Sequence, residues 1–126
     1  MNSLILYNLY PGLFKNVDQW ISNIERIKNM GFNAIYINPF HMPGFSGSLY
    51  SVKDYYAFNE LFFSKDSSPE EQLKKFISSC KDKGLDVYMD LVISHTAIDS
   101  VLVNKHRDWY KLDSDGNIVN PGAWEE

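Results

Sequence analysis

The chain has 126 residues, of which 44% are hydrophobic, 15% aromatic and 22% charged, and its formal net charge at pH 7 is −4. This composition is typical of a folded globular protein and excludes an intrinsically disordered one. The negative charge argues against nucleic acid as a partner, because binding a phosphate backbone requires clustered lysine and arginine.

The N-terminal segment predicts a strand. Residues 4–9 are apolar and favour β-structure, and Pro11 and Gly12 close the run with a turn signal. No basic residue precedes this run, and Asn8 interrupts it, so the segment has the pattern of neither a signal peptide nor a membrane span. We therefore expect a cytoplasmic protein with no membrane partner.

An amphipathic helix and a second strand are expected next. Asn16 and Gln19 provide the N-terminal cap of the helix, and apolar residues recur at helical spacing until Gly31 ends it. The nearly continuous apolar run at residues 32–37 predicts a strand that ends at Asn38. Such a run is typical of a parallel strand with both faces covered.

Residues 40–63 are expected to form a long connection after the second strand. They show no helical periodicity and contain Pro43, Gly44 and Gly47 among several aromatic residues. Long ordered loops in compact domains usually carry function. This connection is therefore a candidate part of the functional site.

A second helix and a third strand follow. Ser68 and Glu71 form a capping box that opens the helix, and Gly84 ends it. Cys80, the only cysteine, falls on the apolar side of this helix, so we expect a buried thiol and no disulfide. Residues 85–92 are strongly apolar and predict the third strand.

The chain changes character after the third strand. We expect Asp99 to cap a short helix. Residues 111–119 alternate around the turn sequence at 114–117, SDGN, which predicts a hairpin. This segment is interpreted as an excursion from the third strand.

Two successive strand–helix–strand units predict an α/β fold with a parallel sheet. Three strands and two helices cannot cover both faces of that sheet, so residues 1–126 are expected to be an incomplete domain. We predict that this chain forms the first three βα units of a (β/α)8 TIM barrel and that the remainder of the barrel is required to complete the domain. Ligand sites in such barrels lie at the carboxyl ends of the strands, here residues 7–10, 37–40 and 90–95.

Three sequence stretches carry a resemblance to the alpha-amylase superfamily, glycoside hydrolase family 13. Residues 90–95, DLVISH, resemble its first signature motif, an Asp followed by an Asn-His pair at the end of strand three. Residues 47–55, GSLYSVKDY, resemble its Gly-Tyr-x-x-x-Asp-Tyr stretch, and residues 37–39 resemble the strand end before it. In this order, on the expected elements, they identify the chain as similar to the N-terminal part of the amylase catalytic barrel.

The resemblance implies roles for five residues. Tyr50 would stack on the apolar face of the sugar at the cleavage point, and His95 would donate hydrogen bonds to hydroxyls of that sugar. Three residues would support the site without touching the reacting atoms. Asp90 would pair with an arginine of the strand-four motif, Asp54 would hold the loop that carries Tyr50, and Asn38 would end the second strand.

Ser94 departs from the family pattern. The family usually has Asn at this position, and in many alpha-amylases that Asn helps to bind a structural calcium ion. A hydroxyl is a poorer calcium ligand than an amide or carboxylate oxygen. Ser94 therefore puts the usual calcium site in doubt, and we expect no other cofactor and no metal ligand.

The resemblance also implies where catalysis takes place. Retaining cleavage needs a carboxylate nucleophile and a carboxylic acid roughly 5 Å apart. In the family these groups follow strands four and five, which correspond to positions beyond Glu126, so this chain alone is expected to be inactive. The parent protein is expected to be a retaining α-glucan hydrolase or transglycosylase that acts on α-glucan or maltooligosaccharide. The alternatives are a non-catalytic amylase-like binding or interaction domain and a natural 126-residue product that is completed by another chain or by self-association of its exposed strand edges.

Overall fold

The structure, a computed structural model, describes residues 3–120. These residues form two compact units. The first lies within Met1–Phe40 and Phe58–Leu91, and the second lies within His41–Ala57 and Val92–Glu126.

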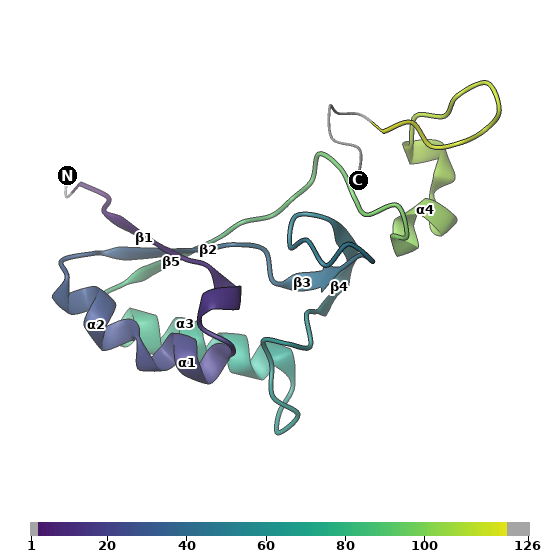
Figure 1. The fold of residues 1–126 in the computed structure, drawn as a ribbon. Coiled ribbons are helices and arrows are strands. Elements are labelled where there is room, and N and C mark those ends of the chain that lie inside the picture. The colour runs from purple at the N-terminus through teal and green to yellow at the C-terminus, as the bar shows by residue number, and fades with distance from the viewer. Residues whose placement is uncertain (1–2, 121–126) are drawn as a thin grey trace. The chain divides into compact units, whose positions relative to one another are not determined.

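The first unit is built on a parallel three-stranded sheet (Figure 1). Its strands are β1 (Leu6–Leu9), β2 (Ala34–Ile37) and β5 (Asp86–Met89), and β2 lies in the middle and pairs in parallel with both neighbours. A short 3-10 helix, η1 (Pro11–Leu13), follows β1. Each strand lies within the apolar run that predicted it, so the predicted parallel sheet is confirmed.

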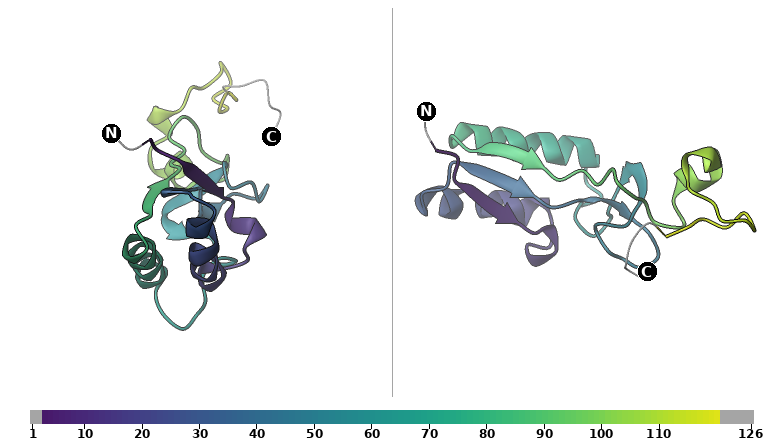
Figure 2. Two further views of the ribbon diagram at one scale, coloured as in Figure 1. Left: turned by 90° about the vertical axis from the view of Figure 1, so that its left-hand side faces the viewer. Right: turned by 90° about the horizontal axis from the view of Figure 1, so that it is seen from above.

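Helices cover one face of this sheet. They are α1 (Val17–Ser22), α2 (Ile24–Asn29) and α3 (Pro69–Asp82), and the views in Figures 1 and 2 agree that all three lie on the same side. The capping box predicted for the last helix is present, with reciprocal hydrogen bonds between Ser68 and Glu71. No helix among residues 3–120 is long and apolar enough to cross a membrane.

The single helix expected up to Gly31 is wrong, because the helix is interrupted at Asn23. The side chains of Ser22 and Asn23 both donate to the carbonyl of Gln19, at 2.9 and 2.8 Å. The Asn23 N–H donates instead to the carbonyl of Trp20, at 3.2 Å. Side-chain donors thus compete with the backbone for the carbonyl that would have continued the helix.

The core of the first unit lies between its helices and the sheet. Trp20 is fully buried, and its ring lies 5.7 to 6.0 Å, centroid to centroid, from the rings of Phe62, Phe63 and Phe76. Cys80 is also fully buried, and burial raises the pKa of its thiol to about 12. The predicted buried cysteine is therefore confirmed.

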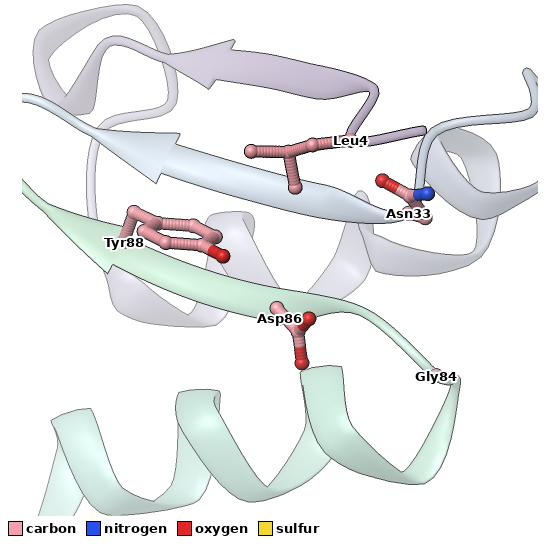
Figure 3. A pocket seen from close by; sticks show the side chains of 5 residues that line it. All are labelled: Leu4, Asn33, Gly84, Asp86 and Tyr88. Atoms are coloured by element: carbon pink, nitrogen blue, oxygen red, sulfur yellow. The ribbon is translucent and has the colours of Figure 1, made fainter. Parts of the chain in front are cut away.

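The opposite face of the sheet is open within this unit. Asp86 and Tyr88 are exposed there, and together with Leu4, Asn33 and Gly84 they line a pocket (Figure 3). This pocket lies near the amino ends of β2 and β5, so it is separate from the strand ends where the site is expected. Within the described part of the first unit, no helix covers this face, which agrees with a (β/α)8 barrel, where all helices lie outside the sheet.

The second unit contains a two-stranded sheet where a loop was expected. Its strands are β3 (His41–Pro43) and β4 (Val52–Phe58). Residues 40–63 do form a long connection between β2 and α3, as predicted, but the two strands within it were not predicted. The β4 sequence is rich in aromatic residues, which favour strands, and β3 provides its partner in the sheet.

The rest of the second unit follows the third strand of the main sheet. It contains helix α4 (Val101–Lys105) and the 3-10 helix η2 (Arg107–Trp109). Ser100 caps α4 through a hydrogen bond from the Leu102 N–H at 3.3 Å. The prediction that Asp99 caps this helix is therefore wrong by one residue.

The predicted hairpin at residues 111–119 is confirmed in outline. Leu112 and Ile118 form an isolated antiparallel bridge, and the Asp113 N–H donates to the Asn117 carbonyl at 2.9 Å. Gly116 occupies the turn with a φ of 83°, a conformation that favours glycine.

Candidate functional site

The five predicted site residues divide between the two units. Asn38 and Asp90 belong to the first unit, whereas Tyr50, Asp54 and His95 belong to the second. The surroundings of these residues are therefore described unit by unit.

In the first unit, the site residues lie at the carboxyl edge of the sheet. Asn38 follows β2 directly and Asp90 follows β5 directly. The Asn38 N–H donates to the Leu9 carbonyl at 3.4 Å, and the Asp90 N–H donates to the Ile37 carbonyl at 2.9 Å. These bonds continue the parallel register by one residue, so Asn38 and Asp90 lie side by side at this edge.

Asp90 lies where a positively charged partner would stabilise its carboxylate. Its side chain is half-buried, and burying a carboxylate is costly unless the charge is paired. Neither of the ion pairs found among residues 3–120 includes Asp90. The expected pairing with an arginine of a further strand stays a prediction.

In the second unit, Tyr50 lies in the loop between β3 and β4. The Gly44 N–H donates to the Ser51 carbonyl at 2.8 Å, which closes the loop at its base. Gly47 has a φ of 74°, a turn conformation that favours glycine. Leu49 is buried, whereas Tyr50 is 42% exposed. The loop thus anchors itself through Leu49 and leaves part of the tyrosine ring accessible.

The segment that carries His95 is tied to main-chain carbonyls of β4. The Ala97 N–H donates to the Val52 carbonyl at 2.9 Å. The Ser100 hydroxyl donates to the Lys53 carbonyl, also at 2.9 Å. Ala97 and the cap residue Ser100 are therefore both fixed to the same strand.

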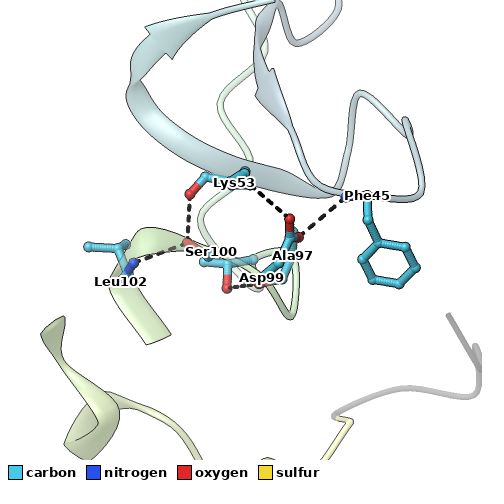
Figure 4. A network of polar contacts seen from close by, with 7 residues as sticks. Phe45, Lys53, Ala97, Asp99, Ser100 and Leu102 are labelled. Carbon is cyan, nitrogen blue, oxygen red and sulfur yellow. Dashed lines mark hydrogen bonds and ion pairs between the residues drawn. The ribbon is translucent and has the colours of Figure 1, made fainter. Parts of the chain in front are cut away.

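Asp99 adds a side-chain link that the sequence interpretation missed (Figure 4). Its carboxylate lies 3.2 Å from Lys53 Nζ and accepts a hydrogen bond from the Phe45 N–H at 3.3 Å. Gly44 is required at this place, because a Cβ there would collide with the Ala97 side chain and crowd the Asp99 carboxylate. Partial burial opposes ionisation of Asp99, but these hydrogen bonds outweigh it and lower its pKa.

His95 itself is exposed and has contacts to its backbone and to its ring. The Tyr55 hydroxyl lies 2.6 Å from the Val92 carbonyl oxygen and 3.3 Å from the His95 carbonyl oxygen. The Ser94 hydroxyl lies 2.9 Å from Nδ1 of the His95 ring. The Tyr55 contacts were not anticipated, although Tyr55 is part of the Asp-Tyr pair in the recognised stretch.

Asp54 is half-buried on β4, and its carboxylate accepts a hydrogen bond from the Tyr56 N–H at 2.9 Å. His41 is a half-buried neighbour whose ring centroid lies 6.0 Å from that of Tyr55. Burial lowers the pKa of His41, and the charge of Asp54 partly opposes this shift. The expected role of Asp54 in holding the Tyr50 loop stays a prediction.

The question of calcium concerns Ser94. Its hydroxyl contacts the His95 ring, at a position where the family pattern places an amide. Within residues 3–120, no group of three or more His, Cys, Asp and Glu side chains is arranged to hold a metal ion. The doubt about the usual calcium site still rests on the Asn-to-Ser difference alone.

Comparisons with known proteins point in one direction. Residues 1–112 match the family model described as the glucanotransferase domain of glycogen debranching enzyme. An alpha-glucosidase from Candida albicans is 27% identical over 141 residues, an alignment that covers 95% of this chain and 24% of that protein. The chain thus spans about a quarter of the length of this curated relative.

Solved structures give the same result for the fold. An alpha-amylase from Lactobacillus plantarum superimposes with a TM-score of 0.83 at 24% identity, over 95% of this chain and 29% of the other. A maltogenic alpha-amylase from Thermotoga neapolitana gives 0.82 at 29% identity, over 94% of this chain and 30% of the other. These matches confirm the predicted fold class, the N-terminal part of a (β/α)8 barrel.

Proposed function

Because this chain belongs to the family of the glycogen debranching enzyme glucanotransferase domain, within the alpha-amylase superfamily, we propose that it forms the first part of the barrel of an α-glucan-active enzyme. The substrate is an α-glucan or maltooligosaccharide, and the reaction is retaining hydrolysis or glucan transfer. The observation that carries this proposal is the extent of the family match, since residues 1–112 include all five site positions.

Tyr50 and His95 are the proposed sugar contacts. Both side chains are exposed, and they belong to the same compact unit. An aromatic face and the C–H face of a pyranose exclude water from each other, which suits the accessible ring of Tyr50. The imidazole of His95 provides the polar contact, a hydrogen bond to a hydroxyl of that same sugar.

The other three site residues have supporting roles in this proposal. Asn38 and Asp90 form the edge of the sheet from which the sugar-binding loops leave. Asp90 is braced by an arginine of a further barrel strand, which accounts for a half-buried carboxylate at a strand end. Asp54 stiffens β4 next to the Tyr50 loop through its bond to the Tyr56 N–H.

In this proposal, the catalytic carboxylates are supplied by further barrel strands. The first unit has a free sheet edge, at β5, where the next strand can pair. An apolar groove runs along the free edge of β5 beside α3. It is lined by Ile77, Lys81, Leu85, Val87, Met89 and Leu91, together with the edge residues Asp86 and Tyr88. Parallel strands are normally covered on both faces, so the next strand and helix of a barrel would bury these side chains.

The test uses the longest expressed form of the protein with maltotriose, followed by chromatographic separation of the products. Hydrolysis gives only shorter sugars, whereas glucan transfer also gives products longer than the substrate. Tyr50→Ala and His95→Ala are each expected to lower kcat/KM by at least about tenfold, because each removes a contact to the reacting sugar.

Two matched variants serve as controls. Tyr56 is 92% exposed on β4, in the same unit as Tyr50, and His106 lies in that unit with its ring centroid 4.0 Å from that of Trp109. Tyr56→Ala and His106→Ala should leave kcat/KM within about twofold of the unmodified protein. Binding of maltotriose without turnover would favour the alternative, a non-catalytic binding domain, and absence of both would contradict the proposal.

A further inference from the structure

The backbone on both sides of His95 is tied to β4. On one side, the Tyr55 hydroxyl lies 2.6 Å from the Val92 carbonyl oxygen and 3.3 Å from that of His95 itself. On the other side, the Ala97 N–H donates to the Val52 carbonyl at 2.9 Å. Burial, with a contribution from Tyr110, raises the pKa of Tyr55, so its phenol remains a neutral hydrogen-bond donor.

The ring of His95 is held by its neighbour. The Ser94 hydroxyl lies 2.9 Å from Nδ1. A neutral imidazole has one nitrogen that donates and one that accepts, and the hydrogen bond at one nitrogen determines which proton the other carries. When the Ser94 hydroxyl donates to Nδ1, Nε2 carries the proton and becomes the donor.

We propose that Tyr55 and Ser94 are positioning residues for His95, with Tyr55 fixing its backbone and Ser94 holding the ring in the tautomer that donates from Nε2. This inference rests on the proposed function, in which His95 donates to a sugar hydroxyl. A group held in its binding geometry before the ligand arrives loses less conformational freedom on binding.

The two positioning contacts do different things, which makes them separable. Tyr55 is half-buried and acts on main-chain atoms, so Tyr55→Phe keeps the packing of the ring and removes only the hydroxyl. Ser94 is exposed and contacts the imidazole, so Ser94→Ala leaves the core intact. Ser94→Thr retains a hydroxyl and is the conservative control.

The first experiment is nitrogen-15 NMR of the imidazole rings at neutral pH, in the longest expressed form of the protein. The signals of His95 are assigned by their loss in the His95→Ala variant. The unmodified protein is expected to show His95 protonated at Nε2, Ser94→Ala to shift the population toward Nδ1 protonation, and Ser94→Thr to restore it. An Nδ1-protonated ring in the unmodified protein, or identical populations in Ser94→Ala, would overturn the assignment of Ser94.

The second experiment is a double-mutant cycle in kcat/KM for maltotriose, or in Kd if the protein binds without turnover. Ser94→Ala and Tyr55→Phe are each expected to cost about fivefold, the usual effect of one hydrogen bond, and Ser94→Thr much less. In a His95→Ala background, neither variant should have a further effect, because both act through the missing ring.

The outcomes separate the two proposals. If Ser94→Ala and Tyr55→Phe cost as much without the His95 ring as with it, their role is merely structural and the inference fails. If His95→Ala itself changes neither kcat/KM nor Kd, the proposed function of His95 fails. In that case the NMR populations still decide whether Ser94 sets the tautomer.

Discussion

At the scale of single residues, His41 and Asp54 provide a prediction about pH. Burial lowers the pKa of His41, and the charge of Asp54 opposes this shift. We therefore expect Asp54→Asn to lower the pKa of His41 further. The measurement is an NMR titration of the His41 ring in both forms of the protein.

The sign of the effect on stability follows from this shift. The pKa of His41 is lower in the folded state than the usual value near 6.5, so the unfolded chain binds a proton first as the pH falls. Above the unfolded-state pKa, the His41 ring is neutral in both states and the shift has no effect on stability. As the pH falls from that value toward the folded-state pKa, protonation of the unfolded chain lowers the free energy of unfolding. A His41 titration midpoint that is unchanged or higher in Asp54→Asn than in the unmodified protein would contradict this account.

Single residues also limited what the sequence could predict. The signature positions Tyr50, Asp90 and His95 were recognisable because their residue types and order match a known pattern. Tyr55 was not singled out, because its contacts with the carbonyls of Val92 and His95 join segments about 40 residues apart. Such contacts depend on the folded arrangement, and nothing in the local sequence indicates them.

At the scale of elements, the link from Lys53 through Asp99 to Phe45 connects β4, the segment before α4 and the Tyr50 loop. We expect Asp99→Asn to speed hydrogen exchange of the loop at residues 44–51, because the Phe45 N–H loses a charged acceptor. A partly exposed ion pair is worth only about 0.5 kcal/mol, so global stability should change little.

The same link should depend on pH. The pKa of Asp99 is lowered in the folded state, so its contribution is present above the unfolded-state pKa and is lost as the pH falls through the folded-state value. Exchange of the loop, after correction for the intrinsic pH dependence, should rise in acid in the unmodified protein. Glu25→Gln, which removes an exposed ion pair from the other unit, is the control. Equal effects of Asp99→Asn and Glu25→Gln on this loop would refute the prediction.

The elements that were predicted correctly have strong local signals. The strands of the parallel sheet are short apolar runs, and α3 has a capping box at its start. The errors arose where local signals compete or depend on a partner. Asn23 interrupts a helix by occupying the Gln19 carbonyl, Ser100 displaces the neighbouring Asp99 as cap, and β4 needs β3 beside it.

At the scale of the whole molecule, the sequence indicated part of a (β/α)8 barrel, and the helices of the first unit lie on one face of its sheet, as they do in such a barrel. The free edge of β5 and the half-buried carboxylate of Asp90 are both features that pairing with further barrel strands would explain. The prediction that residues 1–126 belong to a single incomplete domain remains to be tested on a longer form.

The most direct test of the central claim is isothermal titration of the longest expressed form with maltose and maltotriose, together with an assay of hydrolysis and transfer. The same measurements are made on the Tyr50→Ala, His95→Ala double variant. We predict that the unmodified protein binds and converts maltotriose and that the double variant loses both activities. An unmodified protein that neither binds nor converts α-glucans would contradict the proposed function and leave only the fold assignment.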